Sequence, residues 1–227
     1  MERHFEQELE KLNRRILKMG GLVSAQVRNA MTALVNCDTE LAEEVIANDT
    51  QLDMLDIKID KLCQRIFALT QPVASDLRLI MSALKMNNDL ERMGDLAVNI
   101  AKKIEGVSEF KSIITELKID ELASQTEIII KDVITILNNR NTVFVKDIFA
   151  DASVIKDKVQ SISSKIIDQM MEKSDVIIVA TNLIIILTQI DRMADYATNI
   201  AESIVFLVEG KLVKHGLHPE KGITENT

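Results

Sequence analysis

One apolar pattern occurs twice in this sequence, 100 residues apart, and it limits the possible folds more than any other feature. In each copy, apolar residues follow one another at alternating spacings of four and three. The two copies are Leu79, Ala83, Met86, Leu90, Met93, Ala97, Ile100 and Ile104, and then Val179, Leu183, Ile186, Ile190, Met193, Ala197, Ile200 and Ile204. A second pair of segments shares the offset: Val45, Leu52, Leu55, Ile59, Leu62 and Ile66 match Val145, Ala152, Ile155, Val159, Ile162 and Ile166.

An apolar residue every ~3.5 positions places one seam on a helix and favours near-parallel, left-handed bundle packing. The sequence therefore predicts an all-α protein made of two pseudo-repeated three-helix bundles, six long helices in all. The scarcity of Gly and Pro, 7 and 2 residues, agrees, because turn-rich β folds need both. We expect a first unit over 1–107, a second over 116–210, with a polar boundary at 108–118, and a loose tail over 211–227.

Local signals mark the helix ends. The predicted helices cover about 5–36, 38–69, 74–105, 119–138, 142–172 and 174–210. Asp38 offers an N-cap with Glu40 in the first turn, and Ser174 or Asp175 offers another. Pro72 breaks the chain after the second helix. Gly210 suits a helix C-terminus.

The strongest chemical signal is an acid-x-x-x-Asp motif in the last helix of each unit. Glu91-Arg-Met-Gly-Asp95 in the first unit corresponds to Asp191-Arg-Met-Ala-Asp195 in the second. Residues four apart share a helix face, so each pair brings like charges together and destabilises the helix slightly. A bound cation would relieve that repulsion, and hard or borderline cations accept oxygen ligands. A solvated acidic face is the alternative.

The middle helix of the first unit adds a second acidic stripe, which includes Asp49 and Asp53. If this helix runs antiparallel to the next, both could approach Glu91 and Asp95. In the second unit the offset counterparts are Phe149 and Ser153, and the nearest acidic substitutes are Asp147 and Asp151, in uncertain register. The candidate metal ligands are Asp49, Asp53, Glu91, Asp95, Asp191, Asp195, Asp147 and Asp151. The incomplete second set predicts the weaker site.

Several functional classes lack their signatures. A net charge of −8 without a basic run argues against nucleic-acid binding. The three histidines lie near the termini, and no Gly-rich phosphate loop occurs, so we expect no catalytic residues, no nucleotide-type cofactor site and no enzyme. Cys37 and Cys63 fit reduced thiols better than a disulfide. We see no targeting segment and no bilayer-length apolar run, which predicts a soluble cytoplasmic protein.

Taken together, the motifs resemble the PhoU family of bacterial phosphate-uptake regulators. The residues that carry the resemblance are Gln71 to Arg78, Asp89 to Ala101, Asp191 to Ile200, Val45 to Asp53 and Val208 to Lys211. The resemblance spans about residues 5–214. It implies paired three-helix bundles that form a homodimer, with iron, zinc, manganese or magnesium on the acidic pairs.

The resemblance also implies partners. PhoU-like proteins link the phosphate ABC transporter to its sensor histidine kinase and negatively regulate the phosphate-starvation response. We therefore expect a cytoplasmic regulator of phosphate homeostasis that reaches the inner face of the membrane only through protein partners. The alternatives are a metal-dependent enzyme acting on phosphate esters and a metal-free helical scaffold.

Overall fold

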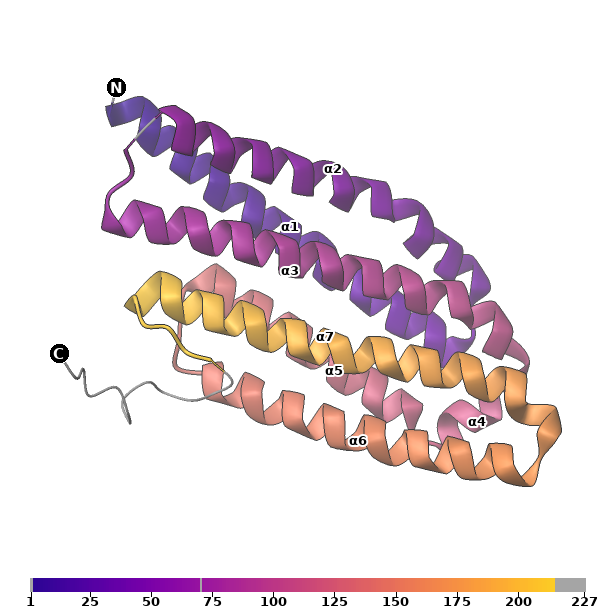
Figure 1. The fold of residues 1–227 in the computed structure, drawn as a ribbon. Helices are drawn as coiled ribbons and strands as arrows, with labels where there is room; N and C mark the ends of the chain where they lie inside the picture. The colour runs from indigo at the N-terminus through magenta and orange to yellow at the C-terminus, as the bar shows by residue number, and fades with distance from the viewer. Residues whose placement is uncertain (1, 70, 215–227) are drawn as a thin grey trace.

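Long α-helices make up almost all of the described chain. The computed structural model describes residues 2–69 and 71–214. Within these ranges the helices are α1 (Glu2–Asn36), α2 (Thr39–Leu69), α3 (Ala74–Ile104), a 3₁₀ helix (Glu105–Phe110), α4 (Lys111–Glu116), α5 (Ile119–Asn139), α6 (Val145–Glu172), a 3₁₀ turn (Ser174–Val176) and α7 (Ile177–Glu209) (Figure 1). The all-α prediction is confirmed.

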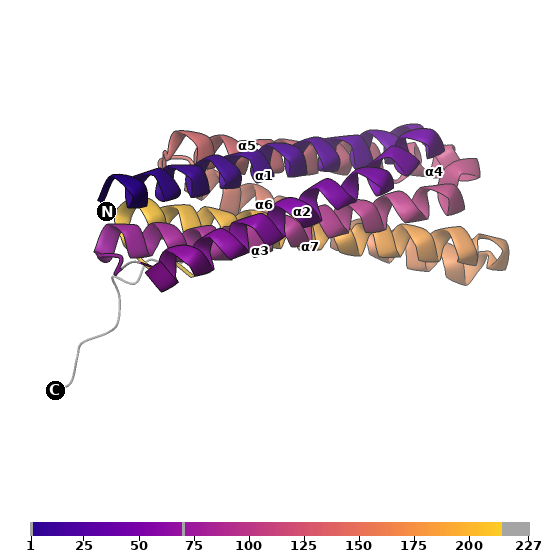
Figure 2. The ribbon, with the colours of Figure 1, turned by 90° about the horizontal axis from the view of Figure 1, so that it is seen from above.

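The long helices lie close to one common axis and form an elongated bundle (Figures 1 and 2). In the first unit α1, α2 and α3 pack on one another, and in the second α5, α6 and α7 do the same. The units meet where α3 lies along α7 and α1 lies along α5. Helices α2 and α6 occupy opposite edges (Figure 1). Each edge helix packs along the last helix of its own unit, and the outer face of each of these helix pairs is called a groove below.

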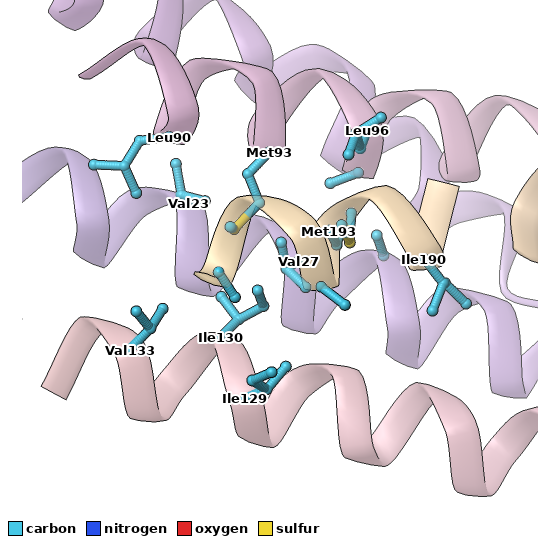
Figure 3. Close-up of a cluster of buried hydrophobic side chains, with 14 of the residues drawn as sticks. Val23, Val27, Leu90, Met93, Leu96, Ile129, Ile130, Val133, Ile190 and Met193 are labelled. Carbon is cyan, nitrogen blue, oxygen red and sulfur yellow. The ribbon is translucent and has the colours of Figure 1, made fainter. Parts of the chain in front are cut away.

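One hydrophobic core runs through both units. Figure 3 shows where side chains of α1, α3, α5 and α7 meet, with Met93 and Met193 near the middle. The predicted seams account for this packing: every seam residue of α2, α6 and α7 is buried, and on α3 only Leu79 is half-buried. The heptad pattern thus identified the buried faces, and both units share the interior that it builds.

The helix ends largely follow their local signals. The backbone N–H of Leu41 donates to Asp38 Oδ1 at 3.0 Å, so Asp38 caps α2 as predicted. Gly210 ends α7 with φ 71°, a left-handed conformation that suits glycine. Two ends differ from the prediction, because α6 begins at Val145 rather than Thr142, and α7 begins after a 3₁₀ turn over Ser174–Val176.

The boundary between the units is more ordered than its polar composition suggested. Residues 105–116 form a 3₁₀ helix and the short α4. Val107 and Ile114 are buried there and fix the segment on the core. The predicted loose tail begins at Lys211, and its residues 215–227 lie outside the described part of the chain.

Among the described residues, the segment 174–209 is the one helical stretch long and apolar enough to cross a membrane. Helices in the cores of soluble proteins also meet this criterion. Here the segment packs against α3, α5 and α6, and its seam from Val179 to Ile204 lies in the core. Burial of this seam within the bundle accounts for part of its apolar character.

Candidate metal centre

The first acidic groove depends on a close approach between α2 and α3 at Gly94. A Cβ added at Gly94 would lie 2.7 Å from Leu52 Cδ1, too close for any larger residue unless Leu52 moves. Leu52 is itself buried. This contact sets α2 directly against α3, with Asp49 and Asp53 flanking Leu52 and the acidic pair flanking Gly94. The antiparallel approach expected from the sequence is formed.

The four predicted ligands of the first unit lie close enough to influence one another. Burial, and then the charges of Asp53 and Asp95, raise the pKa of Asp49. Burial, and then the charge of Asp95, raise the pKa of Glu91, with smaller effects from Asp56 and Asp53. Like charges disfavour ionisation of their neighbours, so the groove is electrostatically strained without a cation.

Nearby polar groups compensate only part of this charge. Arg92 Nε lies 3.6 Å from Glu91 Oε2, and its Nη1 lies 3.9 Å from Asp95 Oδ2. The buried side chain of Gln26 donates from Nε2 to Asp49 Oδ1 at 3.5 Å. Both arginine contacts are half-exposed, so water screens them.

A buried asparagine extends the site in a way that sequence analysis missed. Asn87 Nδ2 donates to Asp56 Oδ1 at 2.6 Å and to Asp60 Oδ1 at 3.2 Å. It thereby holds Asp56 and Asp60, which follow Asp49 and Asp53 along α2, against α3. A signal was present, because Asn87 adjoins the seam residue Met86, where a polar side chain needs a partner.

The second groove, between α6 and α7, contains a cation of its own. Lys156 Nζ lies 2.5 Å from Asp195 Oδ1. Hydrogen bonding to Asp195 is the largest influence on the pKa of Lys156 and raises it, with a smaller contribution from the charge of Asp191. Burial, and then the charge of Asp195, raise the pKa of Asp191, while Lys156 lowers it. Lysine 156 was not among the predicted site residues.

The structure does not bring Asp147 and Asp151 to this groove. Both line a cavity between α5 and α6 of about 200 Å³, together with Asp132 and Thr135. After burial, the charges that raise the pKa of Asp151 are those of Asp132 and Asp147. The two aspartates lie on the α5 side of α6, so the expected pairing with Asp191 and Asp195 is not formed.

The residues fit a cation in one groove better than in the other. The α2–α3 groove brings four carboxylates together, and Arg92 and Gln26 relieve their repulsion only in part, which suits a hard cation. The α6–α7 groove contains an ammonium group in contact with one of its two carboxylates, and this set does not fit. Across residues 2–69 and 71–214, no three acidic, histidine or cysteine side chains are already positioned to hold a metal ion.

A separate polar cluster lies between the units, where α3 packs on α7. Asp89 and Glu202 are both buried, and Lys85 Nζ lies 3.9 Å from Glu202 Oε2. Burial raises the pKa of Asp89 to about 6, opposed by Lys85 and assisted by Glu202. Within the described residues, Asp89 Oδ2 has no hydrogen-bond partner. The buried charge is therefore a cost at neutral pH.

Comparison with known proteins agrees with this architecture. The family model for the PhoU domain matches twice, over residues 16–104 and 119–204. The phosphate-specific transport system accessory protein PhoU homolog of Pseudomonas aeruginosa is 34% identical over 98% of this chain and 93% of its own. The accessory protein PhoU of Escherichia coli K12 is 31% identical over 93% and 88%.

Solved structures give the same result. The crystal structure of PhoU from Pseudomonas aeruginosa matches with a TM-score of 0.86 and 32% identity. The match covers 91% of this chain and 100% of the Pseudomonas chain. The phosphate transport system regulatory protein PhoU from Streptococcus pneumoniae matches with a TM-score of 0.81 and 29% identity, over 92% and 99%. This chain belongs to the PhoU family.

Proposed function

We propose that this protein is a cytoplasmic regulator of phosphate uptake. The observation that carries the proposal is similarity over nearly the whole chain to proteins named as accessory to the phosphate-specific transport system. Because both chains are matched almost end to end, the similarity concerns the complete architecture rather than one shared helix pair. The protein would act by binding the transporter.

The finer regulatory role extends this proposal. We infer that the protein also binds the sensor histidine kinase and keeps the phosphate-starvation response off when phosphate is plentiful, working as a homodimer. A non-enzymatic role is supported by the sequence, since all three histidines, His4, His215 and His218, lie near the termini and no nucleotide-binding loop occurs.

The acidic groove of the first unit would serve this role by binding a metal. Asp49, Asp53, Glu91 and Asp95 are the residues that would hold it, and a cation there would relieve the repulsion between α2 and α3. Bound metal would thereby stabilise the packing of α2, the outermost helix of the unit, on α3. The surface that meets the partners would then depend on metal for its shape.

Deleting the gene tests the regulatory proposal. In phosphate-rich medium, a phosphate-starvation reporter should rise in the deletion strain and return to the repressed level when the wild-type gene is restored. Unchanged repression in the deletion strain would refute the regulatory role. A pull-down of the tagged protein in high and low phosphate should recover the transporter and the kinase. Recovery of the transporter alone would leave uptake control standing and refute the kinase link.

Metal titration tests the role of the acidic groove. Metal-stripped protein would be titrated with Mn²⁺, Zn²⁺, Mg²⁺ and Fe²⁺, comparing Asp95→Ala with Asp195→Ala. We expect Asp95→Ala to abolish the tightest binding and Asp195→Ala to leave it intact. If neither substitution changes metal content or thermal stability, the acidic stripes are solvated surface.

A further inference from the structure

The two units differ in charge at one repeat position that faces the acidic pair. Position 56 on α2 is an aspartate, and its counterpart 100 residues later on α6 is Lys156. In the structure this lysine forms an ion pair with the acidic motif, since Lys156 Nζ lies 2.5 Å from Asp195 Oδ1. Asp56, by contrast, adds its negative charge to the field around Glu91.

The remaining positions that supply carboxylates to the first groove are also changed in the second. Asp49 and Asp53 correspond to Phe149 and Ser153. Asp147 and Asp151, the nearest acidic residues on α6, line the cavity with Asp132 on the α5 side. Of the candidate ligands, Asp191 and Asp195 remain in the groove. Lys156 contacts Asp195, and its charge opposes the burial and the Asp195 charge that raise the pKa of Asp191.

We propose, taking the metal role suggested above for the first unit as the reference, that the second unit binds no metal because the Lys156 ammonium occupies the cation position of its Asp191–Asp195 pair. A divalent ion entering this groove would have to displace the ammonium from Asp195 or lie beside a like charge. Either event costs Coulomb energy. The first groove also contains a cation, Arg92, but the carboxylates that its edge helix supplies offset that charge, so the cost there is smaller. The lysine also joins α6 to α7 without an external ion.

Metal then affects the two halves of the bundle differently. The packing of α2 on α3 responds to free cation, whereas the packing of α6 on α7 is held by a group that is always present. Of the two edge helices, α2 should therefore be stabilised by added metal, whereas α6 should be unaffected by it.

The test measures Mn²⁺ binding in a background that lacks the first site, Glu91→Gln with Asp95→Asn. This background should bind no Mn²⁺ at concentrations that saturate the wild type, as measured by equilibrium dialysis and by electron paramagnetic resonance of free Mn²⁺. Adding Lys156→Glu should create binding at least about tenfold tighter than the background. The matched control is Lys158→Glu, which makes the same charge change on α6 at a residue whose charge acts on Glu121 of α5, and it should create none.

Two results would overturn the assignment. The first is binding of one Mn²⁺ by the background that a further Asp195→Asn change removes. The second is a gain in Mn²⁺ binding from Lys156→Glu that is no larger than the gain from Lys158→Glu. A wild type without bound Mn²⁺ would refute the first-unit site, yet a gain confined to Lys156→Glu would still support the lysine as the blocking group. Repression of the reporter gene is measured in a separate experiment. Failure of the regulatory proposal can therefore be told apart from failure of the first-unit metal site and from failure of the Lys156 assignment.

Amide hydrogen exchange gives a readout that does not depend on a created site. In the wild type, adding Mn²⁺ after chelation should slow exchange in α2 and the facing part of α3, with no change in α6 and α7. Equal slowing in both units would contradict the proposal.

Discussion

Two grooves, one between α2 and α3 and one between α6 and α7, are built from sequence-related helices with the same seams. They differ in the charged groups that lie beside the repelling acidic pair. Each presents an acid-x-x-x-Asp pair toward its edge helix. In the first groove the edge helix adds more carboxylates. Burial, and then the neighbouring negative charges, raise the pKa of Asp49 and Glu91. In the second it contributes Lys156, which contacts Asp195. In the proposed assignment, the two copies keep one core, and the second has a lysine side chain where the first would bind a cation.

The packing beneath the grooves also differs between the two units. Leu52 packs against Gly94 in the first unit, whereas the corresponding residues of the second unit are Ala152 and Ala194. A large residue opposite a glycine is exchanged for two small ones. Both pairs are buried, and an alanine at position 94 is accommodated only if Leu52 moves or is replaced by a smaller residue.

The largest expected effect comes from breaking this packing pair. Leu52→Ala should lower the free energy of unfolding by about 2–4 kcal/mol, because it leaves a cavity beside Gly94. Adding Gly94→Ala should restore part of the loss, since the double variant carries the alanine pair of the second unit and gains helix propensity. Denaturant unfolding of both single variants and the double variant gives the coupling. Strictly additive losses would show that the two side chains do not share one space.

The next effect concerns Asp89, whose repeat counterpart is the neutral Gln189. Its folded-state pKa of about 6 lies above the ordinary value of 3.8, so the folded protein holds the proton more tightly. The associated stability is present below pH 3.8 and is lost as pH rises through about 6. Asp89→Asn should therefore stabilise the protein by about 2 kcal/mol at pH 7.5 and flatten this part of the pH profile.

Thermal unfolding between pH 4 and pH 8 checks this prediction. The converse change, Gln189→Glu, should introduce a smaller pH dependence in the second unit, where the side chain is only half-buried. A profile of Asp89→Asn that matches the wild type would show that the Asp89 carboxyl titrates normally.

A smaller effect is expected from relieving the first groove directly. Asp49→Asn should stabilise the metal-free protein by about 0.5 kcal/mol, since it removes one of several like charges from a partly solvated site. The pKa values of Asp49 and Glu91 are raised in the folded protein, so protonating these groups favours folding. The stability of the metal-free protein should therefore rise as the solution is acidified toward the ordinary pKa values of these carboxyl groups. With Mn²⁺ present the substitution should instead destabilise, so a benefit that persists at saturating Mn²⁺ would argue against Asp49 as a ligand.

The smallest effect belongs to Lys156. Lys156→Met keeps much of the side-chain volume and removes the ion pair with Asp195, whose two side chains are about half exposed. The loss should be about 0.5 kcal/mol or less, insensitive to chelation and reduced at high salt. Thermal unfolding with and without chelator at two salt concentrations measures it. A loss that appears only with chelator would mean that a metal, rather than the ammonium, joins α6 to α7.

The apolar repeat was enough to predict the helices, their buried faces and the pseudo-duplication, because a seam spaced at ~3.5 residues has only one way to bury itself. Local chemistry likewise located the cap at Asp38 and the end at Gly210. The ordered 3₁₀ helix and α4 at 105–116 could not be predicted this way. Their stability comes from Val107 and Ile114 docking on helices distant in sequence.

For the site, the spacing of four residues determined from sequence alone that Glu91 shares a face with Asp95, and Asp191 with Asp195. Which side chains join them depended on how α2 and α6 are rotated against their neighbours. That rotation is set by side-chain volumes, such as Leu52 against Gly94. It brings Asp49 and Asp53 into one groove and Lys156 into the other. It leaves Asp147 and Asp151 facing α5. Contacts between helices far apart in sequence are made by packing of the whole bundle, so only the tertiary structure decided them.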